Sequence, residues 1–387
     1  MRTQVGIVGA GPAGLLLSHL LHLHGISSVV LETRDREYVE RRVRAGVLEQ
    51  GTTDLLREAG VGERLDVEGL RHEGIELRFD GEGHRVPMTE LTGRAITVYG
   101  QQEVVKDLIA RRLDDGGDVR FDVSDVRVDG ISSGSPNIAF RHEGRDSELV
   151  CDVVAGCDGF HGTSRRAVPD GVLRTFERTY PFAWLGILAE ASPAVDELVY
   201  CSHERGFALY SMRSPQVSRL YLQVPSDADV EDWPDGRVWE ELATRFALSG
   251  SDWRPTEGPV FEKGVTPMRS FVTEPMQHGR LLMAGDAVHI VPPTGAKGMN
   301  LAVNDVRLMA RALDAWFSTG DDTLVQSYTR DALRRVWKAQ HFSWWMTSML
   351  HRFDGDDPYQ HRLQVAQLRN VVDSTAYATA LSEHYVG

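Results

Sequence analysis

The feature that most constrains this chain is a glycine pattern near its N-terminus. An apolar segment, Thr3–Val8, is typical of a buried strand and runs directly into Gly9-x-Gly11-x-x-Gly14. An amphipathic helical pattern follows over Leu15–Leu23. In such a strand–turn–helix unit the first glycine permits the tight turn. The second lets the backbone approach a pyrophosphate, and the third lets the helix pack on the strand. Because a helix N-terminus favours negative charge, the pattern predicts a dinucleotide site. The alternative is the same turn with no ligand.

Acidic residues follow three of the predicted strands. A second short strand ends at Glu32, close to the spacing of about 20 residues at which a carboxylate binds the cofactor ribose. Leu149–Ala155 precedes a glycine-containing turn with Asp158, and Arg280–Ala284 precedes another with Asp286. We therefore expect both later strands to return to the sheet that carries the nucleotide.

The composition excludes several classes of protein. The chain has 387 residues, of which 42% are hydrophobic, enough for about two or three domains. Its net charge of -14 argues against nucleic acid or an anionic membrane as a main partner. The cysteines form no Cys-x-x-Cys pair, which favours a reducing cytoplasm over a disulfide framework or a metal site. No leader-like segment and no apolar run of about 18 residues is present, so we expect no membrane span.

A basic cluster stands out in this acidic chain. It consists of Arg34, Arg36, Arg41, Arg42 and Arg44, with Tyr38 among them. One interpretation is a solvated helix face that pairs with nearby glutamates. The other is an anion site for the phosphates of a second, transiently bound nucleotide. A helical pattern over Val47–Ala59 follows the cluster.

The rest of the chain predicts a second, mixed sheet and a helical end. Residues 70–100 alternate apolar and polar side chains, which favours antiparallel strands. The aromatic-rich block 176–275 is also strand-like, apart from a helical pattern at Asp232–Leu248, and Thr323–Leu350 is helical. We predict a discontinuous nucleotide-binding domain (residues 1–70, 98–175 and 276–320), a substrate domain (71–97 and 176–275) and a C-terminal helical region (321–387).

Several motifs, taken together, resemble the single-component flavoprotein monooxygenases, aromatic hydroxylases with a glutathione-reductase-like FAD fold. The glycine pattern and the turns with Asp158 and Asp286 carry this resemblance. Longer segments carry it too: Arg42–Gly51, Ala155–Gly162, Val291–Gly298 and Phe342–Ser348. The likeness covers the whole chain. It implies an α/β (mixed α+β) fold, in which an FAD-binding Rossmann domain holds an inserted mixed-sheet substrate domain and is followed by a C-terminal helical region.

The resemblance implies hydroxylation of a small aromatic acid by FAD, O2 and NAD(P)H, through a flavin C4a-hydroperoxide. It assigns substrate contacts to Ser211, Arg213, Tyr221, Tyr200 and Pro293, and a proton path to Tyr200, Tyr385 and His72, with Pro293 beside the reacting ring. A guanidinium such as that of Arg213 grips a carboxylate with two parallel hydrogen bonds. Removal of a phenolic proton activates the ring carbon next to the oxygen, and tyrosine and histidine can relay that proton.

The resemblance also assigns the nucleotide contacts. Those to FAD fall on Gly9, Gly11, Gly14, Glu32, Arg42, Arg44, Gln102, Asp158, Asp286, Lys297, Gly298, Met299 and Asn300. Those to NAD(P)H fall on Arg34, Tyr38, Arg42, Arg44, His161, Arg165 and Arg269. The chain holds one clear dinucleotide fold, so we expect NAD(P)H to bind transiently in a groove. A homodimer is a further implication of the resemblance.

Two positions depart from the pattern of the family. Position 33 is Thr33, where NADPH-using relatives carry a basic residue, so we expect use of NADH at least comparable to NADPH. Tyr210 replaces a smaller residue but alternates with Ser211 along a strand. We therefore expect Tyr210 to face away from the substrate.

Rival functions remain open. A flavin-dependent halogenase would need a Trp-x-Trp-x-Ile-Pro segment, which this chain lacks. A non-catalytic carrier on the same scaffold would not need the set of Arg213, Tyr200 and Tyr385. Within the enzyme class, 4-aminobenzoate and 3-amino-4-hydroxybenzoate remain alternative substrates, because one small group changes discrimination by only about 1–3 kcal/mol.

Overall fold

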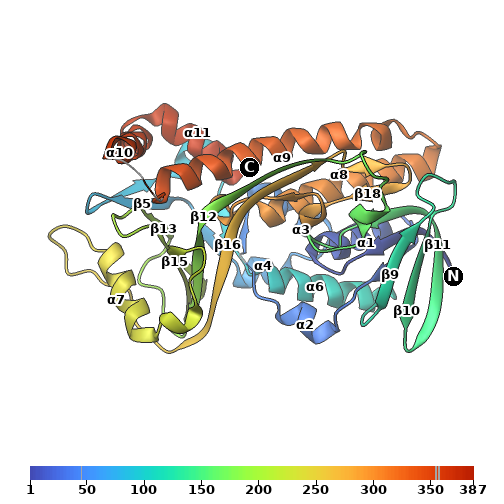
Figure 1. Cartoon of the computed structure of the whole chain (residues 1–387), viewed down its shortest axis with the longest axis horizontal. Coiled ribbons are helices and arrows are strands. Elements are labelled where there is room, and N and C mark those ends of the chain that lie inside the picture. Colours follow the sequence, from blue (N-terminus) through green and yellow to red (C-terminus); the bar gives the residue numbers. More distant parts are fainter. Residues whose placement is uncertain (45, 354, 356–357) are drawn as a thin grey trace.

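Two large sheets and one long helix organise the chain in the computed structural model, which describes residues 1–44, 46–353, 355 and 358–387. Figure 1 shows the two sheets side by side, with the helix α9 (Thr323–Leu350) running across both. The expected α/β (mixed α+β) fold class is confirmed, with a Rossmann-like first sheet and a second, mixed sheet.

The first sheet is built around the strand that precedes the glycine pattern. Its order is β17-β18-β11-β1-β2-β8, and β10 and β9 extend it from β11. The central strand β1 pairs in parallel with β2 and β11. Its second half, from Val5 to Val8, is apolar and buried on both faces, as is typical of a parallel strand. The strands are β1 (Arg2–Val8), β2 (Ser28–Leu31), β8 (Asp118–Arg120), β9 (Ser124–Asp129), β10 (Asn137–His142), β11 (Arg145–Gly156), β17 (Gln277–His278) and β18 (Leu281–Met283).

Helix α1 (Pro12–Leu23), beside this sheet, packs against two others: α6 (Gln101–Asp114) and α8 (Gly298–Thr319). Helix α1 begins with a proline. Proline is tolerated in the first helical turn, because backbone N–H groups there make no hydrogen bond within the helix. Its leucines are buried nearly all round, which is typical of a helix packed between layers.

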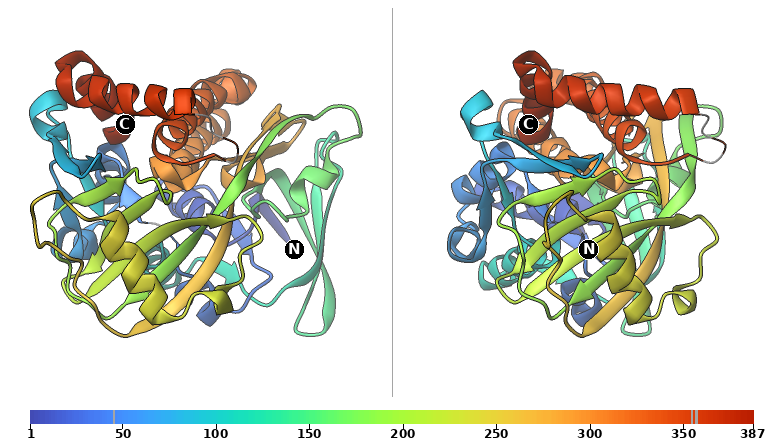
Figure 2. Two further views of the ribbon diagram at one scale, coloured as in Figure 1. Left: turned by 60° about the vertical axis from the view of Figure 1, so that its left-hand side comes forward. Right: turned by 90° about the vertical axis from the view of Figure 1, so that its left-hand side faces the viewer.

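The second sheet is mostly antiparallel, with the order β19-β16-β12-β15-β14-β13-β5-β6. The long strands β12 and β16 pair from Arg174↔Glu274 to Ala189↔Val260, and they run from this sheet toward the first (Figure 2). Helix α7 (Asp235–Arg245) covers its outer face with Trp239 and Leu242. The strands are β5 (Ile75–Phe79), β6 (Glu82–Val86), β12 (Arg174–Ala189), β13 (Leu198–Cys201), β14 (Ala208–Ser214), β15 (Val217–Pro225), β16 (Val260–Glu274) and β19 (His289–Ile290).

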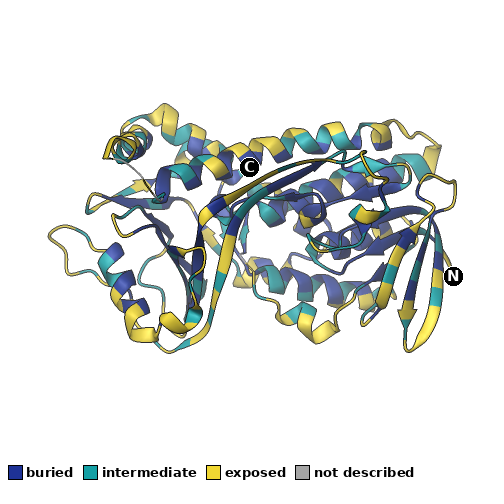
Figure 3. Cartoon of the chain, viewed as in Figure 1, coloured by how far each residue is buried: buried dark blue, intermediate teal, exposed yellow. Residues whose placement is uncertain are grey.

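Helix α9 joins the cores of the two regions. Its N-terminal half, including Tyr328 and Val336, packs into the core of the first sheet. Its C-terminal half, including Phe342 and Met346, packs into the core beside the second sheet. Figure 3 shows the buried inner side of this helix and its exposed outer side. Two further helices, α10 (Pro358–Asp373) and α11 (Thr375–Val386), cover the second core.

The remaining elements connect the two regions. A three-stranded sheet has the order β3-β7-β4. Its strands and the short helices around it are β3 (Val47–Leu48), β4 (Leu70–His72), β7 (Ile96–Val98), α2 (Arg36–Arg41), α3 (Gln50–Glu58), α4 (Glu63–Glu68), α5 (Met88–Thr92), η1 (Ser164–Ala167), η2 (Val230–Asp232), η3 (Gly285–Ala287) and η4 (Pro293–Gly295). The domain bounds expected from the sequence stay a prediction.

Three local expectations were wrong. The helix expected from Val47 starts only at Gln50, because Val47 and Leu48 pair with β7 instead. The strands expected over residues 70–100 are interrupted by α5, which ends at Gly93 with a φ of 72°. The helix expected over Asp232–Leu248 starts only at Asp235, because Pro234 cannot continue a helix from the turn before it.

Candidate functional site

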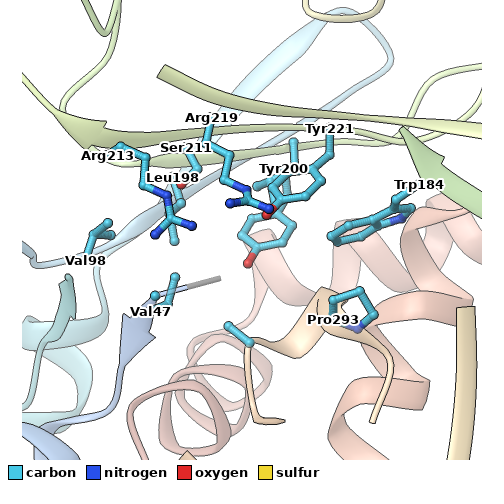
Figure 4. Close-up of a pocket in the computed structure, with 13 residues that line it drawn as sticks. Val47, Val98, Trp184, Leu198, Tyr200, Ser211, Arg213, Arg219, Tyr221 and Pro293 are labelled. Carbon is cyan, nitrogen blue, oxygen red and sulfur yellow. The ribbon is translucent and has the colours of Figure 1, made fainter. Parts of the chain in front are cut away.

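A pocket lies between the second sheet and the turn η4 (Figure 4). Four adjacent strands supply its upper wall, and Pro293 of η4 stands opposite them. The side chains that matter below are Trp184 of β12, Tyr200 of β13, Ser211 and Arg213 of β14, and Arg219 and Tyr221 of β15. Because side chains alternate along each strand, Tyr210 points to the opposite face, where its hydroxyl bonds Ser218 and the Ala194 N–H. The expectation for Tyr210 is confirmed.

One end of the pocket is cationic. Arg213 donates one hydrogen bond to the Arg44 carbonyl, while its Nε is buried and has no partner among the residues that the structure describes. Arg219 has two buried nitrogens, Nε and Nη1, that find no partner in the described part of the chain. Burial, together with the neighbouring Arg219, lowers the pKa of Arg213 to about 10. Unpaired guanidinium N–H groups are costly, so this end of the pocket is suited to an anion.

Sequence reasoning missed Arg219. The signal was present, because Arg219 and Tyr221 stand two residues apart on one strand and so share a face.

The other end of the pocket is lined by the phenol of Tyr200, which is bonded to a second phenol, Tyr385. The hydroxyls of Tyr200 and Tyr385 share a hydrogen bond, and both side chains are almost fully buried. Burial raises the pKa of both tyrosines, so both stay protonated near neutral pH. The Lys297 Nζ fixes the backbone of α11 here, with a bond of 2.9 Å to the Tyr385 carbonyl.

His72 lies apart from the tyrosine pair. It is buried in β4, and neither of its ring nitrogens has a partner among the described residues. Burial lowers its pKa to about 4, although the charges of Glu197 and Asp196 oppose this shift. The structure therefore brings Tyr200 and Tyr385 together but does not bond either of them to His72.

The glycine pattern forms the expected turn. Gly9 has a φ of 102°, and a side chain on Gly14 would lie 2.0 Å from the Gly9 carbonyl oxygen. Gly11 borders open space, with nothing within 4 Å of the position of a Cβ. The Glu32 carboxylate accepts the Ala10 N–H at 2.7 Å, which places it beside the start of α1. A dinucleotide fits this cradle of backbone N–H groups and one carboxylate.

Further polar groups remain available for a flavin cofactor. The Gln102 Oε1, in the first turn of α6, is buried and has no partner within the described ranges. Asp286 is exposed, yet the surrounding protein raises its pKa through desolvation, while His289 and Arg44 oppose the shift. The helix α8 begins at Gly298, so the positive end of its dipole lies at residues 298–300, where the flavin is expected. Next to Gly298, Met299 is buried.

Three predicted cofactor ligands have side chains that bond within the protein. Asn300 accepts from the Glu49 N–H at 2.9 Å and from the Thr52 hydroxyl at 2.8 Å. Lys297 pairs with Glu49 at 2.6 Å. Asp158 accepts from the N–H and the hydroxyl of Ser164, at 2.8 and 2.9 Å. These side chains therefore stabilise the loops in which they lie.

The residues expected along the nicotinamide path form two groups. In the first, a surface hollow is lined by Asp35, Glu37, Tyr38, Arg41 and Arg42, and the Arg34 guanidinium lies 5.0 Å from the Tyr38 ring centre.

The second group surrounds Phe160. The ring of His161 packs edge-on against it, the Arg269 guanidinium lies 4.7 Å from its centre, and Arg165 donates to its carbonyl and to that of Ala287.

The described residues contain no group of three His, Cys, Asp or Glu side chains placed to hold a metal ion. Within the same ranges, no helix has the length and apolar character needed to cross a membrane.

Comparisons with known proteins agree with this geometry. The model of the family described as FAD binding domain matches residues 2–343. The chain is 47% identical over 388 residues to p-hydroxybenzoate hydroxylase of Acinetobacter baylyi, which covers all of this chain and 96% of that protein. A probable NADH-specific resorcinol 4-hydroxylase of Rhodococcus jostii is 26% identical, over 84% of this chain and 61% of that protein. The crystal structure of p-nitrophenol 4-monooxygenase from Pseudomonas putida shares the fold, with a TM-score of 0.81, 18% identity and coverage of 100% of this chain and 99% of that one.

Proposed function

Because the chain belongs to the FAD-dependent aromatic hydroxylases, we propose that it converts 4-hydroxybenzoate to 3,4-dihydroxybenzoate with O2 and NAD(P)H, as a 4-hydroxybenzoate 3-hydroxylase. The observation that carries the proposal is the polarity of one pocket. Among the described residues, guanidinium nitrogens of Arg213 and Arg219 lack a partner at one end, and Tyr200 is bonded to a second phenol, Tyr385, at the other. A benzoate with a hydroxyl opposite its carboxylate matches both ends.

The residues of the pocket have separate tasks in this proposal. Arg213 and Arg219 bind the carboxylate, and the hydroxyls of Ser211 and Tyr221 complete the clamp. This grip orients the ring and so lowers the entropy cost of the reaction. Pro293, on the opposite side of the pocket, holds the ring in place.

At the far end, the substrate hydroxyl meets Tyr200. A tyrosine whose raised pKa keeps it protonated can donate to a phenolate oxygen, and Tyr385 continues the chain. His72 is the proposed outlet, and it would need a water or a movement of β4 to reach Tyr385, since no bond joins them. The phenolate makes the neighbouring ring carbon electron-rich.

The cofactor supplies the redox chemistry. When bound, FAD takes hydride from NAD(P)H and activates O2 for transfer to the substrate ring. We propose that Glu32 binds its ribose and that the backbone of Gly9–Gly14 binds its pyrophosphate. Gln102, Arg42, Arg44 and Asp286 would contact the phosphate and ribityl parts, and the backbone of residues 298–300 would face the isoalloxazine. The chain's buried aromatic side chains around the pocket exclude water, which limits wasteful release of hydrogen peroxide.

The experiment that tests the proposal measures the bound-flavin spectrum and substrate-stimulated oxidation of NADH and NADPH. The substrates are 4-hydroxybenzoate, 4-aminobenzoate, 3-amino-4-hydroxybenzoate and benzoate, with the product identified by mass. We expect 3,4-dihydroxybenzoate in near-stoichiometric yield from the first. Faster, coupled turnover of an amino compound would favour the alternative substrate, and a colourless protein would favour a non-catalytic carrier.

We further propose a homodimer located in the cytoplasm. The indoles of Trp337 and Trp344 are about two-fifths exposed on α9, which suits a surface covered by a second copy. The three cysteines are free and buried, as in a reducing compartment. Light scattering of the purified holoenzyme tests the oligomeric state, and a monomeric mass would contradict the homodimer.

A further inference from the structure

The indole of Trp184 forms one side of the pocket and is held from behind. It lies beside Tyr221, with ring centres 4.9 Å apart, and stands across the pocket from Pro293 (Figure 4). Its Nε1–H is paired within the protein, where it donates to the His351 Nε2 at 2.7 Å. Trp184 and His351 are both buried.

This bond determines the protonation state of His351. An indole N–H can only donate, so the Nε2 must be an unprotonated acceptor. The proton then lies on Nδ1, which donates to the Thr347 carbonyl at 3.1 Å. Both ring nitrogens are satisfied in this one neutral tautomer. Burial favours the same state and lowers the pKa of His351 to about 3.

The His351 ring is also part of an aromatic stack. It lies on Phe182, with ring centres 4.7 Å apart and planes within 9°, and on Phe207 at 4.3 Å. Phe207 in turn stacks on Trp184 at 5.1 Å. The hydrogen bond and the stack together leave the indole little freedom to rotate.

The backbone at His351 is fixed from two sides. His351 follows the last residue of α9, and the Gln364 side chain of α10 donates to its carbonyl at 2.8 Å. The next residue, Arg352, donates its N–H to the Gln223 Oε1 of β15 at 3.1 Å. Gln223 stands two positions after Tyr221 on the same strand, so the strand that lines the pocket also anchors the end of α9.

We propose that His351 is a positioning residue for the substrate, and this inference rests on the proposed function. As a neutral acceptor it fixes the Trp184 indole as a rigid wall. The wall sets how closely an aromatic acid fits between the arginines and the tyrosine pair. His351 contacts neither the substrate nor the cofactor and acts through Trp184 alone.

The test compares His351→Leu, which removes the acceptor, with His351→Gln, whose side-chain carbonyl can still accept the indole N–H. In His351→Leu we expect the Kd of 4-hydroxybenzoate to rise by about tenfold, as for one lost buried hydrogen-bond partner. We expect kcat to change less than the Kd, and His351→Gln to restore binding to within about threefold of the unmodified enzyme. The buried His19, bonded to the Ala59 carbonyl, is the matched control. His19→Leu removes a buried histidine far from the pocket and should leave the Kd unchanged.

A double-mutant cycle separates positioning from general stability. In a Trp184→Phe background the indole N–H is absent, so a further His351→Leu change should no longer alter the Kd. A tenfold effect that persists in this background would overturn the proposal, as would a His351→Gln variant that is no better than His351→Leu.

A readout independent of turnover is the indole N–H resonance of Trp184, assigned by its loss in Trp184→Phe. We expect it to shift upfield in His351→Leu. An unchanged resonance would refute the bond itself. If the unmodified enzyme shows the bonded resonance but does not hydroxylate 4-hydroxybenzoate, then the proposed function fails while the contact stands.

Discussion

At the scale of single residues, the two phenols at the end of the pocket carry the proposed proton transfer. Tyr200→Phe removes the hydroxyl that bonds Tyr385 but keeps the ring that fills the core. We expect the Kd of 4-hydroxybenzoate to change by no more than about threefold, since the arginines still hold the carboxylate. The phenol proton would have no acceptor, so NAD(P)H oxidation should be coupled mainly to hydrogen peroxide.

The matched control for this prediction is Tyr210→Phe. The Tyr210 hydroxyl lies on the other face of the sheet, where it bonds Ser218, so its loss should leave the ratio of product to oxidised NAD(P)H unchanged. Equal coupling in Tyr200→Phe and in the unmodified enzyme would contradict the assigned role of Tyr200.

The opposite end of the pocket depends on the shape of a cation as well as on its charge. Arg213→Lys keeps the charge but loses the planar fork that binds a carboxylate with two bonds. We expect a rise in the Kd of about 10- to 100-fold, with benzoate affected as strongly as 4-hydroxybenzoate because both share the carboxylate. Equilibrium titration of the flavin absorbance measures both. The exposed Arg127, which pairs with Asp129, is the control, and Arg127→Lys should bind normally.

At the scale of elements, we expect substitutions in the glycine turn to affect either folding or cofactor binding, depending on which glycine is changed. A side chain on Gly14 would meet the Gly9 carbonyl oxygen at 2.0 Å, so Gly14→Ala should prevent folding or lower the yield severely. Gly11 borders open space, so Gly11→Ala should fold with an unchanged melting temperature in the absence of FAD. Its affinity for FAD should fall by about tenfold or more, because the added methyl occupies the approach of the pyrophosphate. Ultrafiltration of the released flavin measures this. Full FAD affinity in Gly11→Ala would contradict the proposed position of the pyrophosphate.

The short helix α2 determines the expected choice of NADH or NADPH. Two of its arginines are paired on the helix itself, Arg36 with Glu40 and Arg41 with Glu37, each at 2.6 Å. The surface hollow beside it is also lined by Asp35 and Glu37, whose negative charges would repel the 2′-phosphate of NADPH.

Thr33 adds no cation here, because its side chain is neutral. Its hydroxyl donates to Glu32. We expect the kcat/KM for NADH to equal or exceed that for NADPH, and Thr33→Lys to shift the ratio toward NADPH. A preference for NADPH of about a hundredfold in the unmodified enzyme would contradict this expectation.

The elements also show what sequence patterns can resolve. The strand before the glycines, the strand ending at Glu32 and the helix Thr323–Leu350 were predicted correctly, because each has a clear period and a clear end. The start of α3 was missed, because Val47 and Leu48 continue an apolar pattern while their pairing partner β7 lies far along the chain. Such tertiary pairing leaves no local signal.

The site residues likewise divide into those that the sequence revealed and those that depend on distant contacts. Arg213, Tyr200 and Tyr385 were found through the resemblance, and the structure places all three around one region. His351 was missed, because its importance lies in where its ring nitrogens point and not in any spacing. Arg219 was missed although its spacing from Tyr221 on one strand gave a signal. Lys297 and Asn300 were expected at the cofactor, but their side chains bond Glu49 and Thr52 in a buried network that no local pattern reveals.

At the scale of the whole molecule, buried histidines link the stability of the fold to pH. Burial lowers the pKa of His72 to about 4 and that of His351 to about 3. In the unfolded chain both have ordinary pKa values of about 6.5. Between about pH 6.5 and pH 4 the unfolded chain therefore binds protons that the folded chain does not. The free energy of unfolding should therefore decrease as the pH is lowered from 6.5 to 4, by at most about 1.4 kcal/mol per pH unit for each histidine.

His289 acts in the opposite direction. Burial alone would lower its pKa, but the ion pair with Asp305 at 2.6 Å raises it. Its stabilising contribution is therefore complete below the unfolded pKa of about 6.5 and is lost as pH rises through the raised pKa of the folded state. We therefore expect maximal stability near pH 7, measured by urea unfolding of the FAD-saturated enzyme at pH 5, 6, 7 and 8. His72→Gln removes one of the groups that titrate over this range, so the slope between pH 6.5 and pH 4 should decrease by up to about one proton. A free energy of unfolding that is equal at pH 7 and pH 5, or a slope that His72→Gln leaves unchanged, would show that His72 takes up its proton without unfolding.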